Sequence, residues 1–324
     1  MEPLDVLRTW AVQDSPPGAA IAALVARCPG LPVGWLDSAP VVALYNPRTA
    51  TAIVPAEEAA AFGTAFLPPD DAALKAVVGT ALPTYSEGYA EPVELAVAAI
   101  SDALDGTELS RDDLHEQLRR RLPGALLPWC EGCQSHHARR GLLVMAGLHG
   151  RLCISGRAGR QPAFARTDQR HGWDPPPREQ AAKELVRRYR ATYGPSSAAD
   201  FATWAGLGTA HAKALWALDD TQPPAARLDG VRLLAPGDPV LLGRDREALI
   251  PDAAARRKVW AAVGGMGVVL SDGTAIALWR GRKKGRKLEV SVEPLGGRDL
   301  PLAEIEAAAE RLAPHRGCSS AVLA

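Results

Sequence analysis

Near the end of the chain, a stretch of eight residues carries six positive charges. The cations are Arg280, Arg282, Lys283, Lys284, Arg286 and Lys287. Strand-like residues flank the stretch, so we predict that it forms the tip of a β-hairpin. Cations at such a tip can reach phosphate groups, which supply most non-specific affinity for DNA. They can also protect a sheet edge from pairing, and the stretch alone does not separate these two roles.

A second group of cations favours the DNA-binding role. Arg157 and Arg160 lie in a glycine-containing segment that we predict to be another hairpin tip, and Arg139 and Arg140 lie on the helix expected before it. Two basic hairpins in one chain are more typical of a protein that grips duplex DNA than of edge protection alone.

Two cysteines and two histidines form a compact cluster. Cys130, Cys133, His136 and His137 have a Cys-x2-Cys-x2-His-His spacing, which suits a zinc knuckle. Strong zinc motifs contain two such pairs, and only Cys153 is a further candidate. We therefore favour a turn that leads into a helix without a metal, and keep a zinc site as the alternative.

An amide and a carboxylate precede an alanine-rich helix near the start of the chain. Gln13 and Asp14 stand just before Pro16 and Pro17. Such a pair can position a water molecule, but it can equally cap the helix, and from these residues alone capping is favoured. No glycine-rich phosphate loop, zinc-protease motif or serine-hydrolase elbow occurs. These enzyme templates therefore give no catalytic assignment.

The elements that must position these groups follow a repeated order. Residues 94–104 are predicted to be a helix, Ser110 caps a second helix through Arg121, and a third spans 136–148. Strand-like runs at 151–155 and 163–167 follow. Three helices and a basic hairpin are the order of a winged helix.

The next block repeats this order. Residues 179–193 are predicted to be a helix, and Ser197 and Thr209 are predicted to cap helices that run to Ala205 and Leu218. Strand runs near 231–234 and 240–242 follow. Helix, turn, helix and strands again fit a winged-helix or helix-turn-helix plan.

The last block is richer in strands. Predicted strands span 267–270, 275–279 and 288–292, with Asp272-Gly273 as a tight turn, and a final helix spans 302–312. We expect an α+β protein of tandem winged-helix domains, with winged helices at 91–173 and 178–245 and a β-rich domain at 246–324.

Bulk composition neither supports nor excludes nucleic acid. Lys plus Arg equals Asp plus Glu, at 37 each, so any DNA contact must come from where the charge lies. Five cysteines favour a reducing compartment, and no long apolar stretch predicts a membrane span. We expect a cytoplasmic, nucleoid-associated monomer.

Five segments together resemble a known family. Most of the resemblance comes from "LLAPGDPVLLGRDREALIP" at 233–251, "LVRRYRATYGPSSAADFATWAGL" at 185–207 and "VVLSDGTAIALWRGR" at 268–282. "AVQDSPPGAAIAALVAR" at 11–27 and "PRTATAIVP" at 47–55 add to it more weakly. The family that these segments resemble is the AlkZ-like winged-helix DNA glycosylases.

The resemblance implies that the C-terminal sheet is β-barrel-like and that residues 1–90 form a shortened N-terminal winged-helix-like region. It also implies a monofunctional DNA glycosylase without a metal or nucleotide cofactor. Such an enzyme removes bulky or alkylated bases of the N7-purine type from duplex DNA, in antibiotic self-resistance or base excision repair. It implies that Gln13 orients water with Asp14 as a helper, that Arg48 holds a phosphate, and that 280–287 is the DNA-contacting hairpin. The family's first motif glutamine is Ala11 here, and its histidine is Ala52. A non-catalytic winged-helix DNA-binding or regulatory protein is therefore the alternative.

Overall fold

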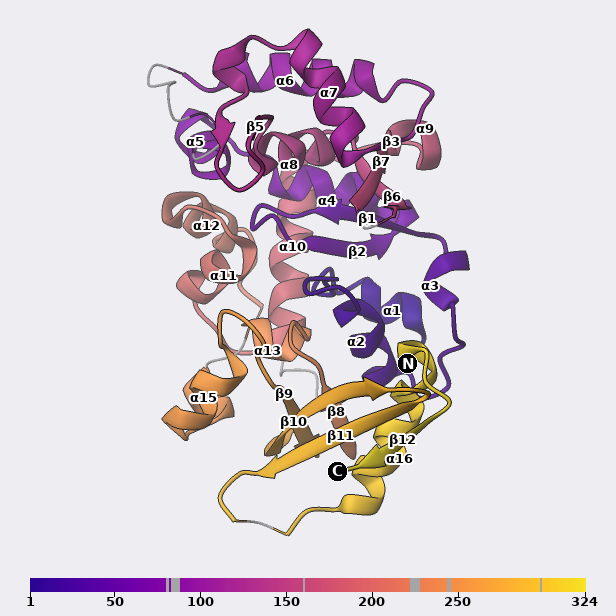
Figure 1. The fold of residues 1–324 in the computed structure, drawn as a ribbon. Helices are drawn as coiled ribbons and strands as arrows, with labels where there is room; N and C mark the ends of the chain where they lie inside the picture. Colours follow the sequence, from indigo (N-terminus) through magenta and orange to yellow (C-terminus); the bar gives the residue numbers. More distant parts are fainter. Residues whose placement is uncertain (80–81, 83–87, 160, 222–227, 244–245, 298) are drawn as a thin grey trace. The chain divides into compact units, whose positions relative to one another are not determined.

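The computed structural model describes residues 1–79, 82, 88–159, 161–221, 228–243, 246–297 and 299–324 (Figure 1). The chain divides into two compact units. The terminal unit contains Met1–Ala39, Ala191–Pro195 and Pro223–Ala324, and the central unit contains Pro40–Arg190 and Ser196–Gln222. Within the described residues, no helix is both long and apolar enough to cross a membrane.

The terminal unit is built on a five-stranded, curled half-barrel sheet (Figure 1). Its order is β12-β11-β10-β9-β8, and all neighbours are antiparallel except β11 and β12. Asp272 and Gly273 both have positive φ, as a two-residue hairpin turn requires, which confirms the predicted turn between β9 and β10. The strands are β8 (Val231–Leu234), β9 (Gly267–Ser271), β10 (Thr274–Lys284), β11 (Lys287–Pro294) and β12 (Ser320–Leu323).

Helices cover this sheet with small and branched apolar residues. α2 and α16 both pack on β8, and the core of the unit includes Ala26, Leu234, Val268 and Leu278. The helices are α1 (Pro3–Leu7), α2 (Ala19–Arg27), α3 (Trp35–Ser38), α13 (Pro239–Gly243), α14 (Arg246–Leu249), α15 (Ala253–Val259), α16 (Leu302–Leu312) and the 3-10 turn η3 (Pro314–Arg316).

The central unit has its own five-stranded sheet, of order β2-β1-β6-β7-β3. Its strands are β1 (Val41–Tyr45), β2 (Thr51–Pro55), β3 (Leu109–Ser110), β6 (Cys153–Ala158) and β7 (Gln161–Ala165), and a separate small hairpin pairs β4 (Trp129–Cys130) with β5 (Ser135–His136). The helices are α4 (Ala59–Phe66), α5 (Asp71–Val78), α6 (Ala90–Ala103), α7 (Arg111–Arg121), α8 (Arg140–Leu148), α9 (Thr167–His171), α10 (Arg178–Tyr193, whose residues from Ala191 on belong to the terminal unit), α11 (Ala198–Ala205) and α12 (Thr209–Trp216), with 3-10 turns η1 (Ala56–Glu58) and η2 (Gly124–Leu126).

Local capping explains where several of these helices begin and end. The Ser110 hydroxyl accepts the Asp113 N–H at the start of α7, and Ser197 and Asp200 form a reciprocal capping box on α11. Gly206 ends α11 in the left-handed conformation, which costs glycine little. These ends match the sequence prediction.

Other predicted boundaries were wrong. Residues 240–242 are helical in α13 rather than a strand, because Pro239 suits a first helical turn and the Asp238 carboxylate accepts the Val240 N–H. Residues 135–136 form strand β5, so α8 begins at Arg140 and not at 136. Thr209 is the first residue of α12, and Gly208 occupies the cap position.

The protein is therefore a mixed α+β fold with a curled C-terminal sheet. In the central unit the order α6, β3, α7, α8, β6 and β7 follows the order expected of the second winged helix. The tandem winged-helix architecture and the four consecutive domains remain predictions.

Candidate nucleic-acid interface

The Gln13–Asp14 segment lies in the terminal unit and is largely enclosed. Gln13 is only 3% exposed, and Ala11 before it is fully buried. The Asp14 Oδ1 atom accepts the backbone N–H of Gly18 at 2.7 Å and of Ala20 at 3.1 Å. The carboxylate thus caps the start of α2, as the residues alone had favoured.

The segment between Asp14 and α2 packs closely against the backbone at Gly237. A Cβ on Gly237 would lie 2.6 Å from the Ser15 carbonyl oxygen, so only glycine fits this approach. The next residue, Asp238, is fully buried and forms a two-pronged ion pair with Arg27, with both N···O distances at 2.8 Å. This pair joins α2 to the segment that leads into α13.

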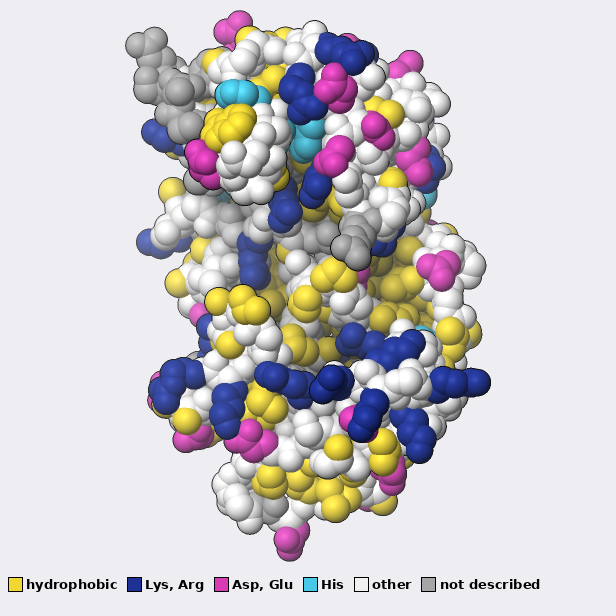
Figure 2. Space-filling view, viewed as in Figure 1, with side chains coloured by type: hydrophobic (Ala, Val, Ile, Leu, Met, Phe, Trp, Pro, Cys, Tyr) yellow, Lys and Arg dark blue, Asp and Glu magenta, His cyan; other side chains and the backbone are white. Residues whose placement is uncertain are grey.

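The basic hairpin lies in the same unit. β10 and β11 pair up to Lys284 and Lys287, so the turn is shorter than predicted and contains Gly285, at φ +59°, and Arg286. All six cations are exposed. Figure 2 shows Lys and Arg side chains gathered over the part of the molecule that holds β10 and β11.

The C-terminal residues hold this hairpin in place. Arg286 O accepts the Ser319 N–H at 2.7 Å, and β12 pairs with β11 from Ser320. The Lys283 ammonium donates to the Gly317 carbonyl at 2.8 Å. The predicted elements ended at 312, so the sequence did not indicate that a twelfth strand supports the hairpin.

The six cations divide by their partners. Arg280 donates to the Gly264 carbonyl at 2.8 Å, and Lys284 forms an ion pair with Glu289 at 3.0 Å. In the part of the chain that the structure describes, the side chains of three cations have no hydrogen-bond or ion-pair partner: Arg282, Arg286 and Lys287. Phosphate groups can therefore bind these three without displacing an existing contact.

A cavity of about 450 Å³ opens beside the hairpin within the terminal unit. Trp279, Leu288 and Leu312 give it an apolar floor, and Pro16 and Pro17 bring the segment after Gln13 to its wall. Arg280, Lys283 and Arg316 are its charged residues, and no carboxylate lines it among the described residues. Sequence reasoning did not single out Trp279 or Arg316.

The indole of Trp279 is locked into this floor. Its N–H donates to the Leu234 carbonyl at 2.9 Å, and the side chain is 4% exposed. A Cβ on Gly267, directly across the β9–β10 pair, would lie 2.3 Å from the indole nitrogen. Gly281, on the hairpin side of Trp279, also leaves room for the indole, because a Cβ at this position would lie 3.1 Å from the ring.

The remaining predicted DNA contacts lie in the central unit. Arg48 is exposed in the β1–β2 turn and donates to the Trp204 carbonyl at 3.4 Å, while Ala52 is buried in β2. Arg139 donates to the Trp129 carbonyl, and Arg140 lies 6.0 Å from the Tyr45 ring centre. Arg157 is exposed near the β6–β7 turn. Arg160 lies outside the described residues.

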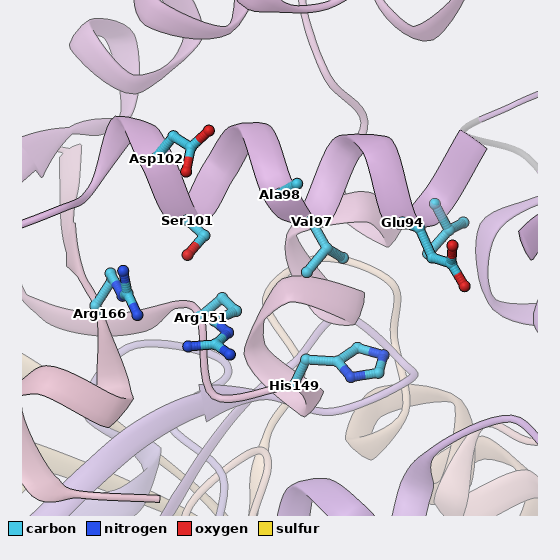
Figure 3. Close-up of a pocket in the computed structure, with 9 residues that line it drawn as sticks. Glu94, Val97, Ala98, Ser101, Asp102, His149, Arg151 and Arg166 are labelled. Carbon is cyan, nitrogen blue, oxygen red and sulfur yellow. The ribbon is translucent and has the colours of Figure 1, made fainter. Parts of the chain in front are cut away.

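A second cavity, of about 550 Å³, lies in the central unit (Figure 3). Glu94, Ser101 and Asp102 project from α6, and His149, Arg151 and Arg166 face them from the segments after α8 and β7. Burial lowers the pKa of His149, and the charge of Arg151 lowers it further. Acidic and basic side chains both line this cavity, whereas the charged residues described in the lining of the cavity beside the hairpin are all basic.

The arginines of this second cavity already have partners. Arg151 and Arg166 both form ion pairs with Asp168, and Arg166 also contacts Asp105. Burial raises the pKa of Asp168, but hydrogen bonding and the charge of Arg166 outweigh burial and lower it. We interpret this group as a structural ion network that ties the segments after α6 and α8 to the start of α9.

Three of the four cysteine and histidine candidates come together. The ligand atoms of Cys130, Cys133 and His137 lie within 4.8 Å of one another. His136 stays outside, because its Nδ1–H donates to the Leu127 carbonyl at 2.8 Å and its ring packs 5.2 Å from that of Trp129. Cys153 is buried in β6 and hydrogen-bonds to the Ala165 carbonyl.

Comparisons with known proteins agree with the resemblance drawn from the sequence. The sequence model described as "DNA glycosylase AlkZ-like" matches residues 6–315. The solved structure of Streptomyces sahachiroi DNA glycosylase AlkZ is similar with a TM-score of 0.70 and 20% identity, covering 100% of this chain and 94% of that one. No curated protein matches. The family match spans nearly the whole chain, and the chain therefore belongs to the AlkZ-like DNA glycosylase family.

Proposed function

We propose that the chain binds duplex DNA through the β10–β11 hairpin and hydrolyses the N-glycosidic bond of a bulky or alkylated purine. Family membership supports the reaction class. The observation that carries the proposal is an exposed hairpin with three unengaged cations, next to a cavity with an apolar floor and no carboxylate in its described lining. The hairpin would bind phosphates, and the cavity would receive a base.

An alkylated purine needs few catalytic groups. A purine alkylated at N7 carries a positive charge, so breaking its bond to the sugar releases a neutral base without prior protonation. The sugar then carries the charge as an oxocarbenium ion. The oxygen of a water molecule forms the new bond to C1′, and that water releases one proton to solvent, which leaves a neutral sugar hydroxyl. The protein has to orient that water and stabilise the positive sugar.

Gln13 is the residue that we propose for orienting the water, with Asp14 as a helper. Pro16 and Pro17 connect this segment to the cavity wall. The Asp14 carboxylate uses Oδ1 to cap α2, so its charge and its second oxygen remain for a role beside the sugar. Arg48, in the central unit, would bind a phosphate.

A non-catalytic DNA-binding protein of the same fold is the second candidate. The buried state of Gln13 and the capping role of Asp14 favour it, as does Ala11 at the family's first glutamine position. Such a protein would recognise damaged or drug-modified DNA without removing the base.

Strand cleavage at a defined lesion tests the proposal. The full chain is incubated with a duplex that contains one N7-alkylguanine, and alkali then converts each base-free site to a strand break. We expect breaks with the unaltered chain, a fall of several orders of magnitude in rate for Gln13→Ala, and retained capping but slower cleavage for Asp14→Asn. If duplex binding is salt-sensitive but no breaks form, the second candidate replaces the first.

Unchanged cleavage by Gln13→Ala would remove that residue from the mechanism while leaving the reaction in place. A lesion-free duplex of the same sequence is the control, because only spontaneous base loss should then give breaks.

A further inference from the structure

The β4–β5 hairpin brings two thiols and an imidazole to one point on the surface of the central unit. Cys130 ends β4, Cys133 lies in the turn, and His137 follows β5. Cys133 N–H donates to the Cys130 carbonyl at 3.2 Å, and Gln134 has a φ of +50°, which turns the chain back toward the first cysteine. All three ligand atoms lie within 4.8 Å of one another.

The ring of His137 is prepared to act as a ligand. Its Nδ1 lies 2.9 Å from the Ala138 carbonyl oxygen, which can only accept, so Nδ1 carries the hydrogen. Nε2 therefore presents a lone pair. This atom is buried, no hydrogen bond of ordinary geometry reaches it among the described residues, and the Cys130 thiol is its polar neighbour. A buried nitrogen of this kind is costly unless it is bound to something.

The donor set selects the ion. Thiolate and neutral imidazole are the ligands of zinc in proteins, whereas magnesium and calcium require oxygen. Cys133 is exposed, so a water molecule can occupy the fourth position of a tetrahedral site. The hydrogen bond from Nδ1 to a backbone carbonyl is the arrangement that fixes the tautomer of a zinc-bound histidine.

The hairpin also needs a constraint that its own strands do not supply. Each strand contributes only two residues, and a two-stranded ribbon is marginally stable at best. Arg119 and Arg139 donate to the carbonyls of His136 and Trp129 and so hold the two strands from outside. An ion bound by both Cys133 in the turn and His137 after β5 would link the two ends of this hairpin.

We propose that Cys130, Cys133 and His137 bind one zinc ion, which fixes the β4–β5 hairpin between α7 and α8. The site is independent of the proposed glycosylase chemistry. Its role is structural, and its loss should loosen residues 129–138 while leaving the rest of the central unit folded.

Metal content measured on the full chain tests this site. The chain is purified without a polyhistidine tag and under reducing conditions, incubated with excess zinc chloride and dialysed, and bound zinc is then measured by atomic absorption. We expect about one zinc ion per chain. Cys133→Ser and His137→Ala should retain less than about a tenth of this amount, while His136→Ala, the matched control, should retain all of it.

Cobalt supplies a second readout. Replacing zinc with cobalt(II) should give the intense visible bands of a tetrahedral site and a thiolate charge-transfer band, both lost in Cys133→Ser. Because Cys133 is exposed, this variant should still fold, and its circular dichroism should match the unaltered chain. Absence of bound zinc from the reduced, unaltered chain overturns the proposal, and so does full zinc retention by His137→Ala.

Discussion

Trp279 shows how single glycines shape the candidate interface. A methyl group at 267 would meet both the indole nitrogen, at 2.3 Å, and the Leu234 carbonyl, at 2.4 Å, and backbone cannot move aside. We expect Gly267→Ala to lower the free energy of unfolding by about 1–3 kcal/mol or more. Gly281→Ala, whose nearest contacts are 3.1 and 3.3 Å, should cost less. Urea denaturation of both variants measures the difference, and equal costs would contradict this account.

The buried ion pair of Arg27 and Asp238 gives a second prediction at this scale. Both side chains are shielded from solvent, at 8% and 0% exposure. Arg27→Ala leaves a buried carboxylate unpaired, and we expect a loss of about 3–5 kcal/mol in the free energy of unfolding. Arg8→Ala breaks an exposed pair with Asp5 and should cost at most about 1 kcal/mol. Similar losses in the two variants would show that burial does not determine how much each ion pair contributes to the free energy of unfolding.

Residue types in the sequence indicated chemistry, but not burial. Gln13 is a plausible water-orienting group by type, and only the fold shows that it is 3% exposed. His136 and His137 are equivalent ligands by spacing, but a carbonyl and a tryptophan ring hold the first outside the cluster. Trp279 and Arg316 line the first cavity through contacts between distant segments, which local patterns do not contain.

At the scale of elements, the basic hairpin carries the DNA-binding prediction. Replacing Arg282, Arg286 and Lys287 with alanine should weaken duplex binding and lower the slope of log K against log salt by about 2–3. These side chains have no partner among the described residues, so stability should change little. Fluorescence anisotropy across a salt series measures the slope.

A matched variant separates local charge from total charge. Arg8, Arg111 and Arg187 are each paired with a neighbouring carboxylate, and replacing all three removes the same amount of positive charge. We expect this variant to keep nearly the full salt slope. An equal reduction in both triple variants would mean that the hairpin has no special part in binding.

Helix α10 supplies a pH-dependent prediction. The hydrogen bond from Arg187 is the largest cause that lowers the pKa of Glu184, to about 2; burial opposes it, and Arg188 adds to it. A lowered folded pKa stabilises the protein above the unfolded value of about 4.5, and this stabilisation disappears as pH falls through about 2. Glu184→Gln should therefore cost about 1–2 kcal/mol at neutral pH and much less near pH 2.

Urea denaturation across this pH range measures the effect. Glu179→Gln, in the exposed first turn of the same helix, is the control and should show no such trend. A constant difference between Glu184→Gln and the unaltered chain would show that the ion pairs to Glu184 do not stabilise the fold.

Predicted and observed elements agree best where local chemistry decides. Ser110 and Ser197 cap helices where the sequence placed them, and Asp272-Gly273 forms the expected turn. Residues 240–242 look like a strand by composition, but Asp238 and Pro239 start a helix there. β12 escaped prediction because its pairing with β11 depends on an approach between distant segments.

At the scale of the whole molecule, zero net charge conceals an uneven distribution. The chain has 37 basic and 37 acidic residues, yet six cations stand together on one hairpin. Many of the other arginines are neutralised by neighbouring carboxylates, as in the pairs of α7 and α10. Binding to a polyanion therefore follows from which cations lack an acidic partner, and the total charge does not predict it.

The terminal unit joins the two ends of the chain, and this leads to a prediction about fragments. α2 packs on β8 and α16, Ala26 lies in the core with Leu234, and Arg27 pairs with Asp238. A fragment of residues 223–324 alone would expose that apolar face and leave Asp238 without its arginine. We expect it to be largely unfolded by circular dichroism, and to gain structure when a peptide of residues 1–39 is added. The same peptide with Arg27→Ala should act only at higher concentration, since an unpaired buried charge costs about 3–5 kcal/mol. If the fragment folded fully without the peptide, the first 39 residues would be an accessory to the half-barrel and not a part of its core.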